Sequence, residues 1–403
     1  MEAYDVLIVG GGAAGFFAAV NAAKQNPKLN IGILERGNSV LSKVKISGGG
    51  RCNVTHAEFI PNVLATHYPR GEKELKGPFH AFMTGDTVAW FESRGIPLKI
   101  EDDGRIFPVS NSAQTIIDCF LDEIQKYGVT LMKNHSVQSI APLENGWQLE
   151  TSKGLFSCQK LLIATGSNPK IWKLLAALGL HIISAVPSLF TFDIDDERIK
   201  DIPGVVAKNV YVEVLGTNLA SDGPLLITHS GLSAPSILKL SAFGAIELAA
   251  LNYCFDVKIN FIQQSQASCM QALLNSKSEL SKKQVRNSTI FNLPKRLWYK
   301  LVEASGICET LRWAEVNKSQ LQALSNQLTA AVFKVHGKST FKEEFVTAGG
   351  IDLKEIDFKT FESKRFKNLF FAGEILNIDG VTGGFNFQNA WTGAYLAAQE
   401  LSK

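Results

Sequence analysis

Apolar runs and polar turns alternate at the start of the chain in a strand, turn, helix, strand order. Residues 5–9 predict a buried strand, residues 13–24, rich in Ala and Phe, predict a helix, and residues 31–34 predict a second strand. A glycine-rich turn at residues 10–15 separates the first strand from the helix. This order is typical of the beginning of a parallel α/β sheet.

The next part of the chain combines a helix with short strands. Residues 112–127 carry apolar side chains on one helical face and stop at Gly128. Residues 136–141, 147–151 and 155–158 predict an antiparallel meander, because turn residues separate them. Residues 161–164 then predict a return to the parallel sheet, followed by a helix over 170–178.

A different pattern opens near Pro187. Strand-like pieces at 189–194, 210–215 and 225–228 predict an inserted β unit, and residues 265–335 are polar and helical with a break at Leu293-Pro294. Strand patterns resume at 345–348 and 368–372, and a last helix is expected over 387–401.

These patterns predict an α/β protein with a Rossmann-type domain, in which a parallel sheet is combined with an antiparallel meander. A β-barrel-like insert and a small helical subdomain interrupt this domain. We expect the Rossmann-type domain at 1–187 and 346–403, the insert at 188–264 and 336–345, and the helical subdomain at 265–335.

Composition narrows the functional classes. The chain has 403 residues, 45% hydrophobic and 20% charged, with a formal charge of +3, which is typical of a globular protein. So small a net charge predicts no nucleic-acid partner. No export signal or membrane-spanning run is visible, and the six cysteines are scattered without metal-type spacing. We therefore expect a soluble, cytoplasmic protein with a small-molecule substrate and no resident metal.

The turn after the first strand has the spacing of a dinucleotide-binding motif. Gly10, Gly12 and Gly15 form GxGxxG, and Glu35 ends the next strand twenty positions after Gly15. The first glycine permits a tight turn, the second lets backbone N–H groups approach a pyrophosphate, and the third allows close packing of helix on sheet. Glu35 would hold the ribose hydroxyls. The predicted cofactor contacts here also include three neighbours, Ala13, Ala14 and Arg36.

This motif alone does not separate NAD from FAD, and the C-terminal region decides between them. A strand followed by Gly373 and Glu374, then Asp379, then a second glycine turn that opens a helix, would form a second clamp for an extended cofactor. Asp379 can accept hydrogen bonds from ribityl hydroxyls, and the helix N-terminus would face the pyrimidine edge of an isoalloxazine. The predicted contacts of this helix start are Gly383, Gly384, Asn386, Phe387 and Gln388. We therefore predict FAD, with NAD binding without flavin as a minor alternative.

Nearly the whole chain resembles the bacterial FAD-dependent oxidoreductases that include the BaiN-type 3-dehydro-bile-acid reductases and the aminoacetone-oxidase-like flavoproteins. Five separated motifs carry the resemblance: SGGGRCNVT at 47–55, GRIFP at 104–108, THSGLS at 228–233, VTAGGI at 346–351, and the segment 373–388. The resemblance implies a glutathione-reductase-like FAD domain interrupted by a β-barrel and a small helical bundle.

The first of these motifs is a glycine-rich loop that would bring backbone amides to the flavin and its phosphates. Its predicted contacts are Ser47, Gly48, Gly49 and Asn53, with Lys43 and Arg51 as countercharges. In the fold that the resemblance implies, Val137 matches the place where the backbone reads the adenine edge. The segment Ala164, Thr165 and Gly166 completes the predicted cofactor contacts.

Two residues are candidates for catalysis. The resemblance would bring the loop of His229 towards the flavin, and imidazole has a pKa suited to proton transfer; the alternative is a histidine held by backbone in a tight turn. Arg105 could bind an acidic or carbonyl substrate, or simply pair with the neighbouring acids at 101–103. Cys52 has no partner cysteine nearby in sequence, which disfavours disulfide reduction.

The chain departs from the family pattern in two places. Ser167-Asn168-Pro169 leads directly into a helix where the family commonly has a further glycine-rich loop, and Ala234 stands where a glycine is usual. Substrates therefore do not carry over from the family.

Three functions remain open at this point. The first is a flavoenzyme that transfers a hydride between flavin and a small organic substrate, one form of which is an NAD(P)H-dependent reductase of an unsaturated compound. The absence of a second GxGxxG disfavours a separate NAD(P)H domain, so a pyridine nucleotide would bind transiently over the flavin. The second is an oxidase of a small amine. The third is a non-catalytic flavoprotein that uses residues 265–335 for docking. The oligomeric state stays open.

Overall fold

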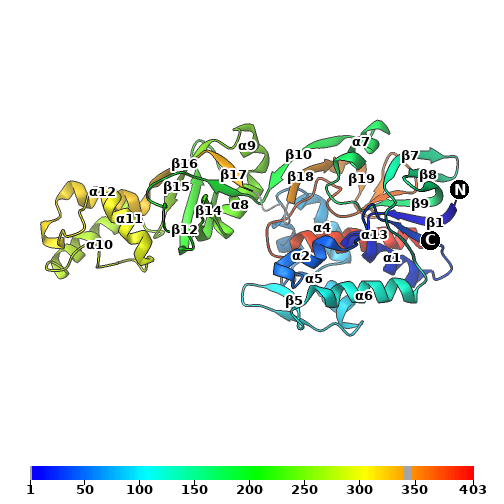
Figure 1. The fold of residues 1–403 in the computed structure, drawn as a ribbon, viewed down its shortest axis with the longest axis horizontal. Coiled ribbons are helices and arrows are strands. Elements are labelled where there is room, and N and C mark those ends of the chain that lie inside the picture. The colour runs from blue at the N-terminus through cyan, green and yellow to red at the C-terminus, as the bar shows by residue number, and fades with distance from the viewer. Residues whose placement is uncertain (1, 340–345) are drawn as a thin grey trace. The chain divides into compact units, whose positions relative to one another are not determined.

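The computed structural model describes residues 2–339 and 346–403. Its internal contacts divide the chain into two compact units, Met1–Pro187 with Lys342–Lys403 and Ser188–Phe341 (Figure 1). We call them the first and the second unit. The three-part division expected from the sequence, with further boundaries inside the second unit, stays a prediction.

A largely parallel sheet forms the centre of the first unit. Its order is β19-β20-β21-β9-β1-β2-β6, and the pairs from β21 to β6 are parallel. The strands are β1 (Glu2–Val9), β2 (Ile31–Leu34), β6 (Thr130–Met132), β9 (Gly154–Ile163), β19 (Ile356–Asp357), β20 (Glu362–Ser363) and β21 (Leu369–Phe371). Val6 to Val9 are buried, as expected for a parallel strand covered on both faces.

The predicted meander is present, but β9 is a single strand where two were expected. Its first half pairs with β8 (Gly146–Thr151), which pairs with β7 (Val137–Leu143), and its second half pairs with β21. The polar pair Gln159-Lys160 predicts a break, yet the extended backbone continues through it because β1 pairs along the other side of β9. One strand thus joins the meander to the parallel sheet.

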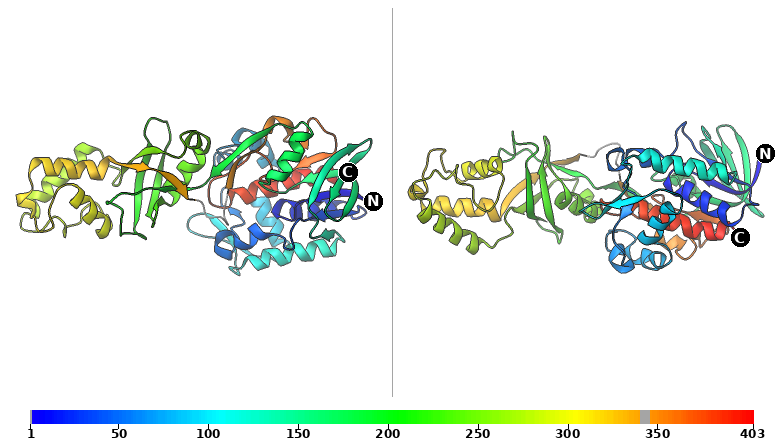
Figure 2. Two further views of the ribbon diagram at one scale, coloured as in Figure 1. Left: turned by 45° about the horizontal axis from the view of Figure 1, so that its top comes forward. Right: turned by 90° about the horizontal axis from the view of Figure 1, so that it is seen from below.

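Three helices pack together beside this sheet. They are α1 (Ala13–Gln25), α6 (Ala113–Lys126) and α13 (Phe385–Leu401), and α1 contacts both of the others (Figure 2). Residues 14–23 of α1 are all buried, which explains its Ala-rich composition. Helix α13 begins two residues earlier than predicted, directly after Gly384.

Several elements between residues 42 and 108, and others near the insertion, complete the first unit. They are α2 (Ser42–Gly50), β3 (Thr55–His56), α3 (Pro61–Ala65), α4 (Glu72–Ala81), α5 (Thr84–Glu92), β4 (Leu98–Ile100), β5 (Arg105–Pro108), α7 (Pro169–Ala177), β10 (Ile182–Ser188), β18 (Val346–Ile351) and the 3-10 turn η2 (Leu353–Glu355). The predicted strand at 345–348 is present from Val346; residue 345 lies outside the described residues.

The second unit contains an antiparallel sheet whose described strands follow the order β16-β15-β12-β13-β14-β11-β17. These strands are β11 (Thr191–Asp193), β12 (Val206–Val214), β13 (Ala220–Ile227), β14 (Gly231–Ser233), β15 (Phe255–Asn260), β16 (Ala331–Val335) and β17 (Gly337–Ser339). The end strands β16 and β17 are separated in sequence by His336 alone, so the sheet curls until its two ends meet. This is the barrel-like insert that the sequence predicts.

Helices complete the second unit: α8 (Pro235–Phe243), α9 (Ala245–Ala250), α10 (Gln266–Glu279), α11 (Lys295–Ala304), the 3-10 turn η1 (Trp313–Glu315) and α12 (Lys318–Thr329). Helix α11 begins after the predicted Leu293-Pro294 break. The helical prediction for 331–335 is wrong, since these residues alternate between buried and exposed positions and form β16. We call residues 265–329 the helical segment. Its buried apolar residues belong to the same hydrophobic core as those of the antiparallel sheet.

Among the described residues, no helix combines the length and the apolar character that crossing a membrane requires.

Candidate active site

The glycine turn after β1 has two closely packed positions and one open position. A Cβ atom at Gly10, where φ is +118°, would lie 2.4 Å from the Ala164 carbonyl oxygen, and one at Gly15 would lie 2.0 Å from the Gly10 carbonyl oxygen. Neither position accepts a side chain. A Cβ atom at Gly12 meets nothing within 4 Å. Gly12 therefore leaves room for a ligand at the N-terminus of α1.

Glu35 lies beside this turn. One carboxylate oxygen accepts a hydrogen bond from the Gly11 N–H at 2.9 Å, and the other accepts from the Gly37 N–H at 2.7 Å. The acidic residue at the end of β2 thus fixes the turn as well as standing where a ribose would bind. Arg36 is exposed, and Ala13 and Ala14 begin α1.

The carboxyl ends of three parallel strands meet at this turn. Gly10 follows β1, the segment 164–166 follows β9, and Gly373 follows β21. Gly10 packs on the carbonyl of Ala164, and a Cβ atom at Gly373 would lie 3.4 Å from that of Ala14. Ligands of open α/β sheets bind at such an edge. The structure therefore brings these predicted contacts together.

The predicted glycine-rich loop interrupts the end of α2. Ser47 is extended, and Gly48, Gly49 and Gly50 have φ values of +57°, +69° and +84°, which glycine adopts most readily. A Cβ atom at Gly48 would lie 2.7 Å from the Phe107 ring, whereas one at Gly49 meets nothing within 4 Å. Gly49 is the second open position, after Gly12.

One buried polar atom beside this loop has no partner among the described residues. Asn53 is 8% exposed, and its Oδ1 makes no hydrogen bond. A buried acceptor without a donor is costly, so this atom suits a ligand that supplies an N–H group. Nearby in the loop sequence, Lys43 pairs with Glu374, which joins two predicted contacts from opposite ends of the chain.

The start of α13 is held tightly to β3. Gly383 and Gly384 have φ values of +129° and +99°, and a Cβ atom at Gly384 would lie 2.6 Å from the Thr55 backbone. The Asn386 side chain closes the loop before the helix, since its Oδ1 accepts from the Gly380 N–H at 2.8 Å and its Nδ2 donates to the Gly380 oxygen at 3.0 Å. The Asn386 side chain therefore fixes the backbone of the loop that precedes α13.

Gln388 and Phe387 are also engaged within the protein. The Gln388 amide oxygen accepts from the hydroxyls of Thr55 at 2.6 Å and Thr87 at 3.0 Å, and its Nε2 contacts the Thr392 hydroxyl at 3.1 Å. The Phe387 ring stacks on Trp391. Both residues thus hold the start of α13 in place, and their contact with a cofactor stays a prediction.

Asp379 has a partner that the sequence analysis missed. The carboxylate is fully buried and forms a two-armed ion pair with Arg70. The two residues are 309 positions apart, and no spacing pattern connects them. A carboxylate fixed by an arginine fork keeps lone pairs that can accept hydrogen bonds from hydroxyl groups.

The two predicted catalytic residues have different surroundings. Arg105 donates to Asp103 at 2.8 Å and lies 3.6 Å from Glu101, which also pairs with Arg51 at 2.6 Å. Pairing with the neighbouring acids was the alternative reading of Arg105. His229 is exposed in the turn between β13 and β14, in the second unit. Val137 is buried at the start of β7.

Cys52 follows the glycine loop and is fully buried. Burial raises the pKa of its thiol to about 12, and a hydrogen bond with Ser47 offsets this only in part. The thiolate required for disulfide exchange is therefore disfavoured at neutral pH.

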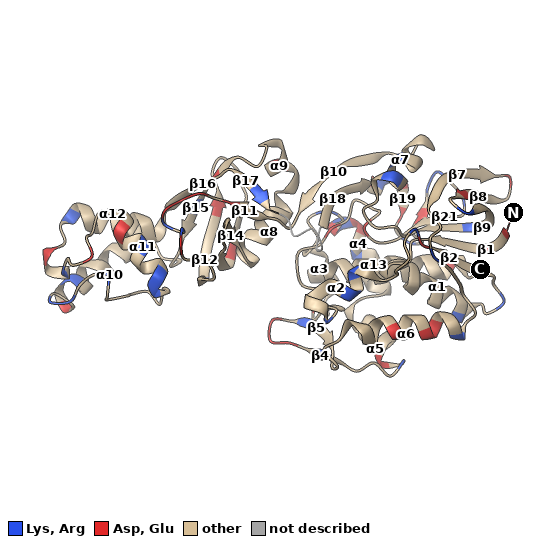
Figure 3. Ribbon diagram, in the orientation of Figure 1, with Lys and Arg blue, Asp and Glu red and all other residues tan. Residues whose placement is uncertain are grey.

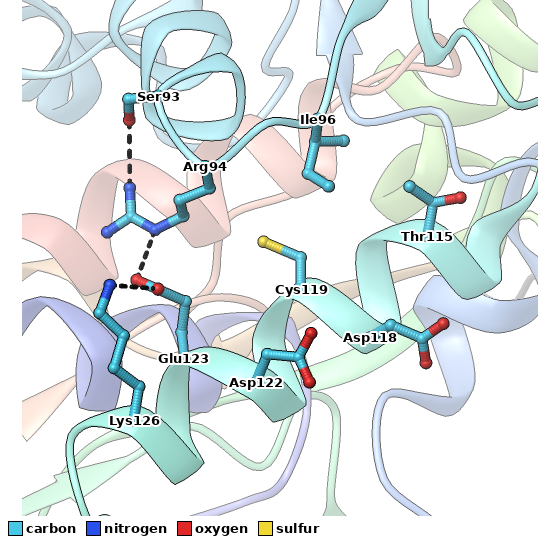
Figure 4. A pocket seen from close by; sticks show the side chains of 9 residues that line it. All are labelled: Ser93, Arg94, Ile96, Thr115, Asp118, Cys119, Asp122, Glu123 and Lys126. Carbon is cyan, nitrogen blue, oxygen red and sulfur yellow. Dashed lines mark hydrogen bonds and ion pairs between the residues drawn. The ribbon is translucent and has the colours of Figure 1, made fainter.

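A separate hollow lies between the end of α5 and α6 (Figure 4). Glu123 bridges Arg94 at 2.8 Å and Lys126 at 2.9 Å, and the Arg94 guanidinium covers the Trp90 ring. Burial alone would raise the pKa of Glu123, but the two cations outweigh it and lower that pKa. None of the predicted cofactor contacts lines this hollow. The ion pair of Glu123 with Arg94 connects α6 to the turn that follows α5, which indicates a structural role.

Comparison with known proteins identifies the family of this chain. A family model described as the HI0933-like protein Rossmann domain matches residues 4–400. The chain belongs to this family. It is 29% identical over 414 residues to the ribosomal RNA dihydrouridine synthase of Escherichia coli, covering 100% of this chain and 98% of that protein. It is 26% identical over 412 residues to the 3-dehydro-bile acid delta(4,6)-reductase of Clostridium scindens, covering 98% of each.

Solved structures support the fold of this HI0933-like protein. A 3-ketosteroid-delta4-(5alpha)-dehydrogenase from Rhodococcus jostii RHA1 superimposes with a TM-score of 0.52 and 12% identity, covering 100% of this chain and 97% of that one. At this identity the likeness concerns the fold alone.

The family and the site together define an FAD-dependent oxidoreductase. The residues present fit FAD. Gly12 and Gly49 leave open backbone where phosphates and a ring system need close approach, and an isoalloxazine carries the ring N–H that the unpartnered Asn53 oxygen requires. Sequence analysis predicts both glycine turns and Asn53 as cofactor contacts, and these assignments stay predictions; it did not single out Arg70.

Proposed function

We propose that this protein is an NAD(P)H-dependent flavoenzyme that saturates a carbon–carbon double bond conjugated to a carbonyl group, with uridine in ribosomal RNA as its substrate. The observation that carries the proposal is full-length similarity to two ribosomal RNA dihydrouridine synthases, at 29% and 26% identity. Dihydrouridine differs from uridine by saturation of the C5–C6 bond, which is conjugated to the C4 carbonyl.

The bile-acid reductase relative supports the same type of reaction. Its name describes reduction at the 4 and 6 positions of a 3-oxo compound, where a double bond is again conjugated to a carbonyl. Two relatives with different substrates thus share one chemical step. The balance is simple: NAD(P)H gives a hydride, a proton comes from solvent or a protein group, and the double bond becomes a single bond.

In this reaction the chain supplies position and charge. Bound FAD would supply the chemistry of hydride transfer between NAD(P)H and the unsaturated carbon. Gly12 and Gly49 would admit the cofactor, and Asn53 would offer it an acceptor. Asp379, held in place by its ion pair with Arg70, would accept from the ribityl hydroxyls of the cofactor. The chain has no second GxGxxG motif, so NAD(P)H would bind transiently. A cytoplasmic location would suit both nucleotide donor and RNA.

A small cyclic enone is the second candidate substrate, because the bile-acid reductase matches over 98% of both chains. It requires the same donor and the same step, so only the oxidising substrate distinguishes it from uridine.

The test uses the purified holoenzyme without oxygen. NADPH or NADH should bleach the flavin absorption, and a ribosomal RNA transcript should restore it with a mass gain of two hydrogen atoms on uridine. The matched control is the same transcript made with dihydrouridine, which should leave the flavin bleached. Restoration by a 3-oxo-4,6-diene steroid but not by RNA would assign the second candidate. Indifference to both nucleotides, with peroxide formed from an amine in air, would refute the reductase proposal in favour of an oxidase.

A further inference from the structure

The positive charge of this chain is concentrated in one segment. Residues 265–329 carry nine Lys and Arg against four Asp and Glu, a formal charge of +5. The rest of the chain carries thirty-two Lys and Arg against thirty-four Asp and Glu, a formal charge of −2. Figure 3 shows basic positions at the ends of helices α10, α11 and α12. The overall value of +3 therefore hides a strongly basic segment in an otherwise slightly acidic protein.

Three of these basic residues lie on two loops that are joined by their backbones. Lys282 and Lys283 follow α10, and Arg312 precedes η1. Gln284 and Arg312 form a β-bridge, and the Trp313 N–H donates to the Lys283 oxygen at 3.0 Å. This backbone pairing places the three residues on neighbouring loops at one edge of the helical segment. We call Lys282, Lys283 and Arg312 the basic edge.

The side chains of the basic edge are exposed, and none of the three forms an ion pair within the described residues. Of the acids nearby in sequence, Glu309 pairs with Arg286, Glu315 accepts from the Arg312 backbone N–H at 2.9 Å, and Glu279 is exposed at the end of α10. Three cations that form no ion pairs of their own repel one another. Such an edge favours a polyanionic partner that would neutralise it.

The loops under the basic edge are anchored in the core. Trp313 is fully buried, and the indole N–H of the buried Trp298 donates to the Val285 carbonyl at 3.0 Å. Rigid loops present their charges in a constant arrangement, which lowers the entropy lost on binding.

We propose that the basic edge binds the phosphate backbone of RNA. This rests on the proposed function, since it assigns a contact surface for the RNA substrate. Lysine ammonium groups and the arginine fork are the side chains that contact phosphates most often, and such contacts position nucleic acid without reading its sequence. The expectation of no nucleic-acid partner came from net charge, and the same experiment tests it.

The test compares two triple variants of the full-length holoenzyme. The first is K282Q/K283Q/R312Q; the matched control, K24Q/K28Q/K153Q, removes three exposed lysines of the first unit. Binding of a labelled RNA hairpin with a uridine-rich loop is measured by fluorescence anisotropy at several KCl concentrations. Thermal melting and the flavin spectrum confirm that both variants fold and hold FAD.

Each phosphate contact contributes about 0.7–0.9 to the slope of log K against log salt. Loss of three contacts should lower that slope by about 2 and weaken binding roughly 100-fold near 0.1 M salt. The control variant should bind like the wild type. Bleaching of the flavin by NAD(P)H should be unchanged in both.

The outcomes separate this inference from the proposed function. In one outcome, the wild type reduces RNA uridine while the first variant keeps the wild-type affinity and salt slope. That result would overturn RNA binding by the basic edge and leave the proposed function standing. RNA binding that depends on the edge without any uridine reduction would support the edge and overturn the proposed function. Wild-type protein that binds anionic lipid vesicles or a poly-glutamate peptide but no RNA would overturn the edge as an RNA surface.

Discussion

Replacing Gly12 by Ala should separate cofactor binding from folding. Gly12 precedes α1 with φ −98° and ψ −170°, a conformation open to any residue, and its Cβ atom would meet no protein atom within 4 Å. Alanine is a poorer N-cap than glycine but restricts the unfolded chain, and the two effects of about 0.5–1 kcal/mol each nearly cancel. The protein without cofactor should therefore melt within a few degrees of the wild type.

The same methyl group would stand where the pyrophosphate must approach. Loss of one or two charge-assisted hydrogen bonds, at about 1.5–3 kcal/mol each, should weaken FAD binding by about 3 kcal/mol, or roughly 100-fold. The assay is a titration of stripped protein with FAD, followed by quenching of flavin fluorescence, alongside thermal melting of the stripped protein.

Gly15→Ala is the matched comparison from the same motif. Its Cβ atom would lie 2.0 Å from the Gly10 carbonyl oxygen, so the stripped protein itself should lose about 1–3 kcal/mol of stability. If Gly12→Ala destabilised the stripped protein as much as Gly15→Ala does, or left FAD affinity unchanged, the assignment of Gly12 as the open cofactor position would be refuted.

Three further predictions concern strain, charge and thiols. Ala234 has φ +80° and ψ 176°, a conformation nearly confined to glycine, so Ala234→Gly should raise stability by about 1 kcal/mol in chemical denaturation, and a loss of stability would contradict the strain. Glu123→Gln should destabilise by about 3 kcal/mol at neutral pH, because it leaves the buried Arg94 guanidinium without its carboxylate. Since the pKa of Glu123 is lowered on folding, its ionic contribution is present above about pH 4.3 and is lost as the pH falls through the folded pKa, so the variant and wild-type stability curves should converge in acid rather than stay parallel. In native protein only the exposed thiols, Cys254 and Cys308, should react rapidly with Ellman's reagent; a third rapid equivalent would mean that a buried thiol opens to solvent.

Much of the fold follows from local patterns. The apolar run of β1, the glycine turn and the Ala-rich α1 each indicate their structure within a few residues, and β2 was predicted with its observed bounds. The loop at 47–50 was also foreseen, since consecutive glycines rarely occur without a backbone that needs positive φ. These elements depend mainly on neighbours in sequence.

The misses depend on distant partners. Residues 331–335 follow a helical pattern and become a strand because they pair with β15. The Arg70–Asp379 pair joins residues 309 positions apart, and its burial is invisible in either local sequence. Gln388 stays a predicted cofactor contact, but its amide also bonds Thr55, Thr87 and Thr392, which no local pattern shows. Tertiary contacts decided each case.

The pairing of β9 with β21 has a consequence for synthesis of the protein. Leu161 to Ile163 lie beside Leu369 to Phe371, so the central sheet receives a strand that leaves the ribosome about two hundred residues after its neighbour. Helix α13, which packs on α1, emerges later still. The second unit has its own apolar core and is complete before either arrives. A nascent chain therefore passes through a stage in which the insert can fold while the cofactor-binding unit is unfinished. FAD loading then waits for α13 to emerge, and removal of this helix should yield a protein that retains a folded insert but stays colourless.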